Sequence, residues 1–184
     1  DALADFLREK KLGRGRAGVI LPDRLVFRRN VTVPPMTDGQ LAYNLPFEFK
    51  DYLTQEKGRY FFDYALQGLE KDDEGQVEGM ELFACAALKT TIEDYRNMFR
   101  RAGFHMKLAI PEECAFGNLA KFHAQQNPGH DGDVCIVDIG HRGTRRYIYR
   151  EGRFRTRRAV DLGLWDLVQQ LSADRGVDAH IAHT

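Results

Sequence analysis

The hydrophobic pattern of the chain changes repeatedly between the two-residue period of strands and the three-to-four-residue period of helices, which predicts a mixed α/β protein. Helices are indicated where apolar residues recur behind a capping residue or a proline, and strands where β-branched and aromatic runs are bounded by glycine and proline. The pattern predicts helices over residues 1–11, 37–52, 90–102, 111–126 and 164–173, and strands over residues 17–21, 25–33, 59–67, 77–88, 104–110, 134–138, 146–149 and 153–160.

Several short motifs refine these elements. Thr37 with Gln40, and Thr90 with Glu93, have the spacing of capping boxes, so each threonine is expected to begin a helix. Pro46 lies inside the first of these helices, and an interior proline removes a backbone donor, so a kink or break is expected there.

The most informative segment lies near residue 140. A hydrophobic run delivers Asp138 into a turn that contains Gly140 and Gly143 and is closed by Thr144, after which the chain returns as a second strand. An aspartate at a strand end can hold water around Mg²⁺, and glycines let backbone amides approach an anion. These four residues are therefore the candidate phosphate-binding residues. The alternative is a purely structural hairpin.

Composition sets limits on other functions. The 184 residues are 43% hydrophobic, enough for a buried core, and 27 basic residues balance 27 acidic ones, so no overall field favours nucleic acid or an anionic membrane. No signal peptide and no apolar run of about 20 residues is found, which predicts a cytosolic protein. Cys85, Cys114 and Cys135 lack metal or redox spacing and are expected to be buried free thiols.

Eight arginines lie between residues 142 and 158, interleaved with aromatic residues, and could face an acidic protein or a phosphate backbone. Strand alternation places Arg146 and Arg150 on the face opposite Tyr147 and Tyr149, which is typical of an exposed sheet surface. A protein interface is thus favoured over nucleic acid.

Other polar residues receive structural interpretations. Glu112 and Glu113 are expected to stabilise a helix N-terminus, because the helix dipole favours acidic residues there. His141 and Arg142 are expected to be exposed turn residues, and His180 with His183 lacks a third ligand, so no metal is assigned. The aromatic residues Phe47, Phe49, Tyr52, Tyr60, Phe61, Phe62 and Tyr64 are expected to form mostly core, with part left exposed for a partner peptide.

Taken in order, the motifs resemble the PilM-like family of actin-like proteins in type IV pilus assembly and, more distantly, the FtsA-like proteins of cell division. The resemblance covers nearly the whole chain. It is carried by residues 19–22, 33–34, 41–53, 82–88, 95–103, 111–113 and 137–144.

The resemblance implies an actin-like, ribonuclease H-like α/β fold with an inserted small β-α-β-β subdomain. The implied division is residues 1–23 as the end of the first lobe, 24–109 as the inserted subdomain, 110–132 as the connecting helix and loop, and 133–184 as the start of the second lobe. Of the three nucleotide-clasping elements of this fold, only the middle one is recognised. The chain is therefore expected to be a piece of a protein roughly twice as long. The whole protein is expected to bind ATP and Mg²⁺, and this piece alone is expected to bind them poorly.

The resemblance also implies a function. It predicts a cytoplasmic scaffold that binds the N-terminal tail of a membrane-anchored pilus component, with nucleotide as a conformational clamp and the membrane reached only through that partner. An FtsA-like filament protein and an ATP-dependent small-molecule kinase are the alternatives. Unpaired strand edges between residues 134 and 160 further predict a homo-oligomer or a strand-exchanged dimer.

Overall fold

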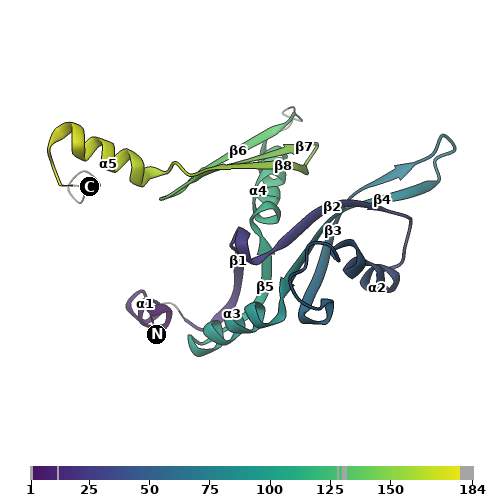
Figure 1. The fold of residues 1–184 in the computed structure, drawn as a ribbon, viewed down its shortest axis with the longest axis horizontal. Coiled ribbons are helices and arrows are strands. Elements are labelled where there is room, and N and C mark those ends of the chain that lie inside the picture. Colours follow the sequence, from purple (N-terminus) through teal and green to yellow (C-terminus); the bar gives the residue numbers. More distant parts are fainter. Residues whose placement is uncertain (1, 12, 128, 130–131, 179–184) are drawn as a thin grey trace. The chain divides into compact units, whose positions relative to one another are not determined.

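The computed structural model describes residues 2–11, 13–127, 129 and 132–178, and it is a mixed α/β fold (Figure 1). In chain order the elements are α1 (Ala2–Glu9), β1 (Gly15–Leu21), the 3₁₀ turn η1 (Asp23–Leu25), β2 (Phe27–Val33), α2 (Asp38–Glu48), the 3₁₀ turn η2 (Lys57–Arg59), β3 (Tyr60–Lys71), β4 (Val77–Leu88), α3 (Lys89–Arg101), β5 (Phe104–Pro111), α4 (Glu112–Gln126), β6 (Val134–Ile139), β7 (Thr144–Arg150), β8 (Arg153–Val160) and α5 (Leu164–Arg175).

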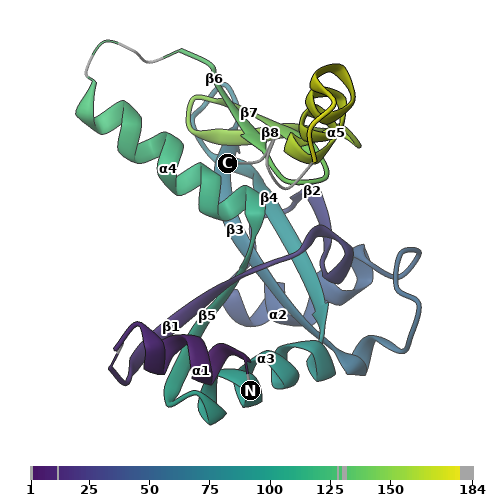
Figure 2. The same cartoon turned by 90° about the vertical axis from the view of Figure 1, so that its left-hand side faces the viewer.

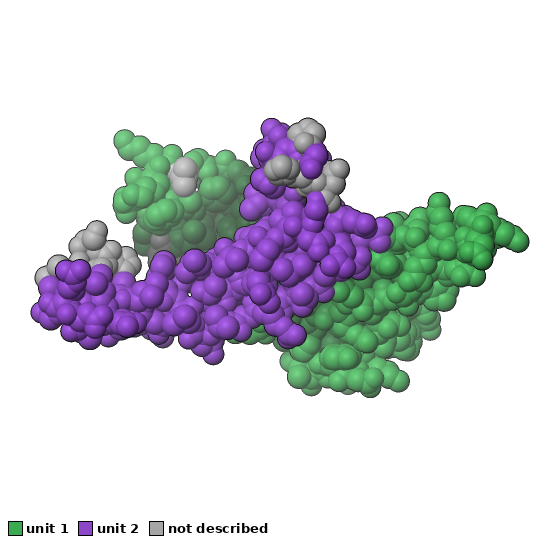
Figure 3. Space-filling view, turned by 90° about the horizontal axis from the view of Figure 1, so that it is seen from above, with its two compact units in different colours: residues 1–115 green, residues 116–184 purple. Residues whose placement is uncertain are grey.

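The chain forms two compact units, residues 1–115 and residues 116–184, coloured separately in Figure 3. Helix α4 begins in the first unit and continues in the second. The finer four-part division expected from the sequence stays a prediction.

The first layer of unit 1 is a parallel pair of strands, β1 and β5, which lie side by side in Figure 2. Helix α3 leads directly into β5, and Ile92 of α3 packs with Leu21, Val26 and Ala87 in a small core. A parallel pair needs a crossover connection, because its strands run in the same direction. Here that connection carries all of the chain from η1 to α3.

The second layer of unit 1 is the β-α-β-β subdomain, an antiparallel sheet of order β2-β4-β3 with α2 packed on it. Its largest fully buried side chains are Phe49, Leu41 and Leu82. Helix α2 begins at the expected capping box: the Thr37 side chain accepts from the Gln40 amide, and the Gln40 side chain accepts from the Thr37 amide. Of the aromatic row, Phe49 and Tyr60 are buried, while Phe47, Tyr52 and Phe61 are exposed.

The predicted break at Pro46 is wrong. Helix α2 runs without interruption from Asp38 to Glu48. Pro46 lies in the last turn, so it removes one intrahelical donor, the one to the Ala42 carbonyl. Leu45 and Phe49, on either side of it, are 2% and 0% exposed, so core packing holds the turn in helical form.

The predicted capping box at Thr90 and Glu93 is also wrong. Helix α3 begins at Lys89, directly after β4, with Leu88 in the capping position and no side-chain cap. The pairing of β4 with β3 continues to Leu88, which fixes the start of the helix one residue before Thr90. Its end agrees with expectation, because Gly103 adopts φ of +87° just beyond the last turn.

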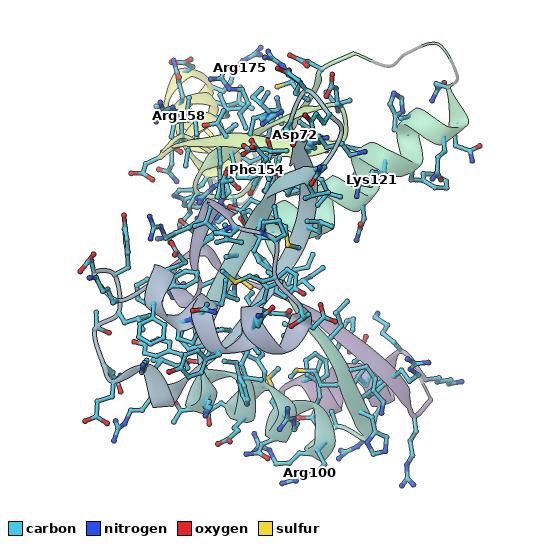
Figure 4. All side chains as sticks on the ribbon, turned by 90° about the vertical axis from the view of Figure 1, so that its right-hand side faces the viewer. Asp72, Arg100, Lys121, Phe154, Arg158 and Arg175 are labelled. Carbon is cyan, nitrogen blue, oxygen red and sulfur yellow. The ribbon has the colours of Figure 1, made fainter. Side chains whose placement is uncertain are left out.

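Two boundaries differ from the sequence prediction. Strand β3 extends to Lys71, beyond the expected end at residue 67, whereas β4 has the expected bounds. The expected loop over residues 70–76 therefore narrows to a turn in which the Gln76 amide donates to the Asp72 carboxylate at 2.7 Å; Asp72 is labelled in Figure 4. Pro111 ends β5 rather than opening the helix, because it still pairs with Leu21.

Glu113 anchors the start of α4 to β2 within unit 1. Its carboxylate is 2% exposed and lies 2.7 Å from Nε of Arg28, which also pairs with Asp23. The structural interpretation of the acidic pair is thus confirmed for Glu113.

Unit 2 contains the antiparallel sheet β6-β7-β8, with α4 against one face, and the helix α5. Tyr147 and Tyr149 are fully buried there, while Arg146 and Arg150 are exposed, which confirms the predicted alternation. Gly117 permits close packing, since a Cβ at that position would lie 3.2 Å from the Tyr149 ring. The prediction that every cysteine is buried is wrong: Cys135 lies on the exposed face of β6, and Cys85 and Cys114 are half-buried.

We expect Glu113→Gln to lower the free energy of unfolding by about 3 kcal/mol, because Arg28 would lose its buried counter-charge. Glu93→Gln, at an exposed position of α3, is the matched control and should change it by about 0.5 kcal/mol or less. Urea unfolding followed by circular dichroism measures both. Equal stability of the two variants would contradict the anchoring role.

Candidate functional site

The four candidate phosphate-binding residues lie together at one end of the β6-β7 hairpin. Asp138 pairs with Arg145 and Ile139 with Thr144 in the antiparallel register, so the loop consists of residues 140–143. The Gly140 amide donates to the Gly143 carbonyl at 2.9 Å and closes this loop. The sequence therefore predicted correctly which residues meet here.

Helix α5 begins directly on this loop. The backbone amides of Leu164 and Trp165, at the helix N-terminus, donate to the carbonyls of Gly140 and His141 at 3.0 and 2.8 Å. Amides of the first helical turn have no partner inside the helix, so the hairpin loop satisfies them. The Thr144 hydroxyl donates to the Leu162 carbonyl at 2.7 Å, so this hydroxyl also holds the segment between β8 and α5 to the hairpin.

The glycines of the loop are needed for close approach of backbone rather than for unusual dihedral angles. Neither Gly140 nor Gly143 has a positive φ, but a Cβ on Gly140 would lie 2.9 Å from the Gly143 carbonyl oxygen. A Cβ on Gly163 would lie 2.5 Å from the His141 carbonyl oxygen and 2.6 Å from the Gly143 amide. Gly163 is the residue of this site that the sequence analysis missed, and its position one residue before a helix was the available signal.

Asp138 does not stand free at the end of its strand. Its carboxylate lies 3.3 Å from Nη1 of Arg145, and both side chains are about one-third exposed (35% and 37%). A metal would have to displace this arginine from the carboxylate. The described residues contain no cluster of three or more His, Cys, Asp or Glu side chains suited to a metal.

The loop offers backbone donors to an anion. In the part of the chain that the structure describes, the amides of His141, Arg142 and Gly143 donate to no backbone carbonyl. His141 and Arg142 are exposed, as expected, and the His141 ring also contacts Trp165 at 5.5 Å between centroids. Consecutive free amides beside an arginine suit an oxyanion such as phosphate.

A separate cavity of about 270 Å³ lies inside unit 1, where the β1-β5 layer and α3 meet the β-α-β-β subdomain. Its walls are mostly apolar, and Asp63 and Arg96 supply opposite charges. The remaining lining residues are Leu21, Val26, Phe61, Phe62, Cys85, Ala87, Ile92, Ala109 and Pro111. Burial, with a smaller contribution from Asp63, raises the pKa of the Cys85 thiol to about 12, so it is neutral and unreactive near pH 7. This wall is suited to binding apolar groups.

We expect Gly163→Ala to destabilise the protein by about 2 kcal/mol or more, because its methyl group would meet the backbone of the hairpin loop. The control is Gly39→Ala in α2, where a Cβ has no heavy atom within 4 Å. Thermal unfolding and the exchange rate of the Leu164 amide measure the effect. Unchanged stability and exchange in Gly163→Ala would show that the helix does not depend on this contact.

Comparisons with known proteins bear on the fold. No family model and no curated protein matches the sequence. Among solved structures, the chain is similar to the PilM-PilN type IV pilus biogenesis complex, with a TM-score of 0.73 and 20% identity over 98% of this chain and 54% of that one. It is also similar to the cytoplasmic domain of EpsL, an inner-membrane component of the Vibrio cholerae type II secretion system, with a TM-score of 0.55 and 17% identity over 96% of this chain and 60% of that one.

The chain thus spans between half and two-thirds of the length of these two structures. Within the described residues, none of the helices combines the length and hydrophobicity needed to cross a membrane. The predicted α/β fold of the actin-like, PilM-like type is confirmed by the arrangement of the strands and by the similarity to these structures.

Proposed function

We propose that this chain is part of a cytoplasmic actin-like scaffold of a type IV pilus or related secretion machine, reaching the inner membrane through a membrane-anchored partner. The partner's cytoplasmic N-terminal tail would dock in the cavity of unit 1. The observation that carries this proposal is the position of the cavity, which lies where the β-α-β-β subdomain meets the β1-β5 layer.

The chemistry of the cavity supports peptide binding. A volume of about 270 Å³ is just below that of typical small-molecule pockets, which suits one or two anchoring side chains of a peptide. The exposed Phe61 borders the cavity, with the Lys89 ammonium 5.5 Å from its ring. Asp63 and Arg96 supply a carboxylate and a guanidinium that can orient a peptide backbone.

The fold supports the same proposal. One of the similar structures is a complex of PilM with PilN, and the other belongs to an inner-membrane secretion component. We therefore propose that the partner is a membrane-anchored protein whose short cytoplasmic tail enters the apolar cavity.

Nucleotide enters the proposal as a conformational clamp in the whole protein. The free amides of His141, Arg142 and Gly143 fit a phosphate oxygen, and Asp138 would hold Mg²⁺ only after leaving Arg145. Bound ATP, a charged ligand, would stabilise the arrangement of the protein for which it has the higher affinity.

Fluorescence anisotropy with a labelled peptide of a PilN-type cytoplasmic tail tests the docking site. We expect Ala109→Trp, which fills the cavity, and Arg96→Glu, which reverses its charge, each to weaken binding about tenfold or more. Ala159→Trp, at an exposed position of β8, is the control and should leave affinity unchanged. Absence of binding by the unmodified chain, or equal affinity of all variants, would contradict the proposal.

A further inference from the structure

Both oxygen-bearing side chains among the four candidate phosphate-binding residues are engaged within the fold. The Asp138 carboxylate lies 3.3 Å from Nη1 of Arg145, and the Thr144 hydroxyl donates to the Leu162 carbonyl at 2.7 Å. Mg²⁺ at a phosphate is normally held by one or two carboxylates of the protein. A carboxylate whose charge an arginine already compensates is a weak ligand for it. The donor set of this hairpin therefore does not fit the Mg²⁺ that the family resemblance implies.

Arg145 supplies a fixed positive charge at the same place. It lies opposite Asp138 in the register of β6 and β7, so the two side chains share one face of the sheet. A Cβ on Gly140 would lie 3.9 Å from Nη1 of Arg145, so the guanidinium also reaches the first residue of the loop. Because arginine stays protonated in proteins, this charge is present at every physiological pH. Beside Asp138, the guanidinium thus has the role of counter-charge that a metal would otherwise have.

The loop itself offers hydrogen-bond donors to an anion. The amides of His141, Arg142 and Gly143 donate to no backbone carbonyl within the described part of the chain. The first turn of α5 gives its own amides to the loop carbonyls, which places the positive end of the helix dipole at the loop. Three arginines and one aspartate lie between residues 138 and 146, so the local charge is positive. An oxyanion with several acceptor oxygens, such as phosphate, suits these donors.

We propose that the hairpin loop binds phosphate without a metal, with the Arg145 guanidinium in place of Mg²⁺ as the counter-charge. The inference rests on the phosphate role proposed above for this loop and adds that no metal takes part. It also reverses the role of Asp138. In a metal-dependent site this carboxylate helps to hold phosphate through the ion, whereas here its negative charge repels phosphate and competes with it for Arg145. Asp138 therefore limits the affinity of the loop for phosphate.

A nuclear magnetic resonance titration of the nitrogen-labelled chain with inorganic phosphate tests this inference. Inorganic phosphate binds Mg²⁺ weakly, so the ion can be added or removed without removing the ligand. We expect the amide signals of His141, Arg142 and Gly143 to shift, with the same dissociation constant in Mg²⁺ and in EDTA. Ionic strength and pH are held constant, because salt screens the attraction between arginine and phosphate.

Two substitutions test the roles of the ion pair. In EDTA, Asp138→Asn should lower the dissociation constant for phosphate about threefold or more, because it removes a negative charge close to the anion. Arg145→Gln should raise the constant about threefold or more, because it removes the counter-charge. The matched controls are Asp133→Asn and Arg150→Gln, which change the net charge equally. That ion pair, at 2.9 Å, lies at the opposite end of the same hairpin, so both controls should leave the constant unchanged.

The outcomes separate this inference from the phosphate role on which it rests. Tighter binding in Mg²⁺ than in EDTA, weaker binding by Asp138→Asn, or an equal change in Asp133→Asn would overturn the metal-independent site, while shifts at the loop would still support its phosphate role. Signals of residues 141–143 that shift in neither condition would contradict the phosphate role and this inference together. The amide signals outside the loop report whether each variant keeps its fold, and the comparison of Mg²⁺ with EDTA needs no variant.

Discussion

The parallel pairing of β1 with β5 is the constraint on which unit 1 depends. Two parallel strands cannot be joined by a tight turn, so the chain between them must leave the layer and return. Here the excursion folds as the β-α-β-β subdomain, and α3 brings it back into β5. The cavity lies where the chain leaves the β1-β5 layer and returns to it. Leu21 and Val26 line it at the departure, and Ala109 and Pro111 line it at the return. The position of the proposed docking site is thus a consequence of topology.

Unit 2 depends on a contact between backbone segments. The hairpin loop gives its carbonyls to the first turn of α5 and keeps several amides free, so one turn serves both as a helix anchor and as a candidate phosphate cradle. Gly163 makes this possible, because a side chain there would occupy the space of the loop. The same contact directs α5 away from its own sheet (Figure 1).

Sequence reasoning succeeded where local signals agree with tertiary packing. The Thr37 capping box and the burial of Tyr147 follow from short-range chemistry and strand alternation, and both are observed. It failed where contacts with a segment distant in the sequence determine the local structure. Strand pairing placed the start of α3 one residue before Thr90, core packing kept α2 helical through Pro46, and a cross-strand arginine engaged Asp138. The four residues of the candidate site lie together as the sequence predicted, and their binding of phosphate stays a prediction. The ion pair of Asp138 and the role of Gly163 depend on contacts between segments that no local pattern encodes.

The central claim is that the cavity of unit 1 receives the cytoplasmic tail of a membrane-anchored partner. Intermolecular nuclear Overhauser effects between a bound PilN-type tail peptide and methyl-labelled protein test it most directly. The account predicts such effects at the methyl groups of Leu21, Val26 and Ile92, which line the cavity. Effects confined to methyl groups of residues 116–184, with none at these three side chains, would contradict it.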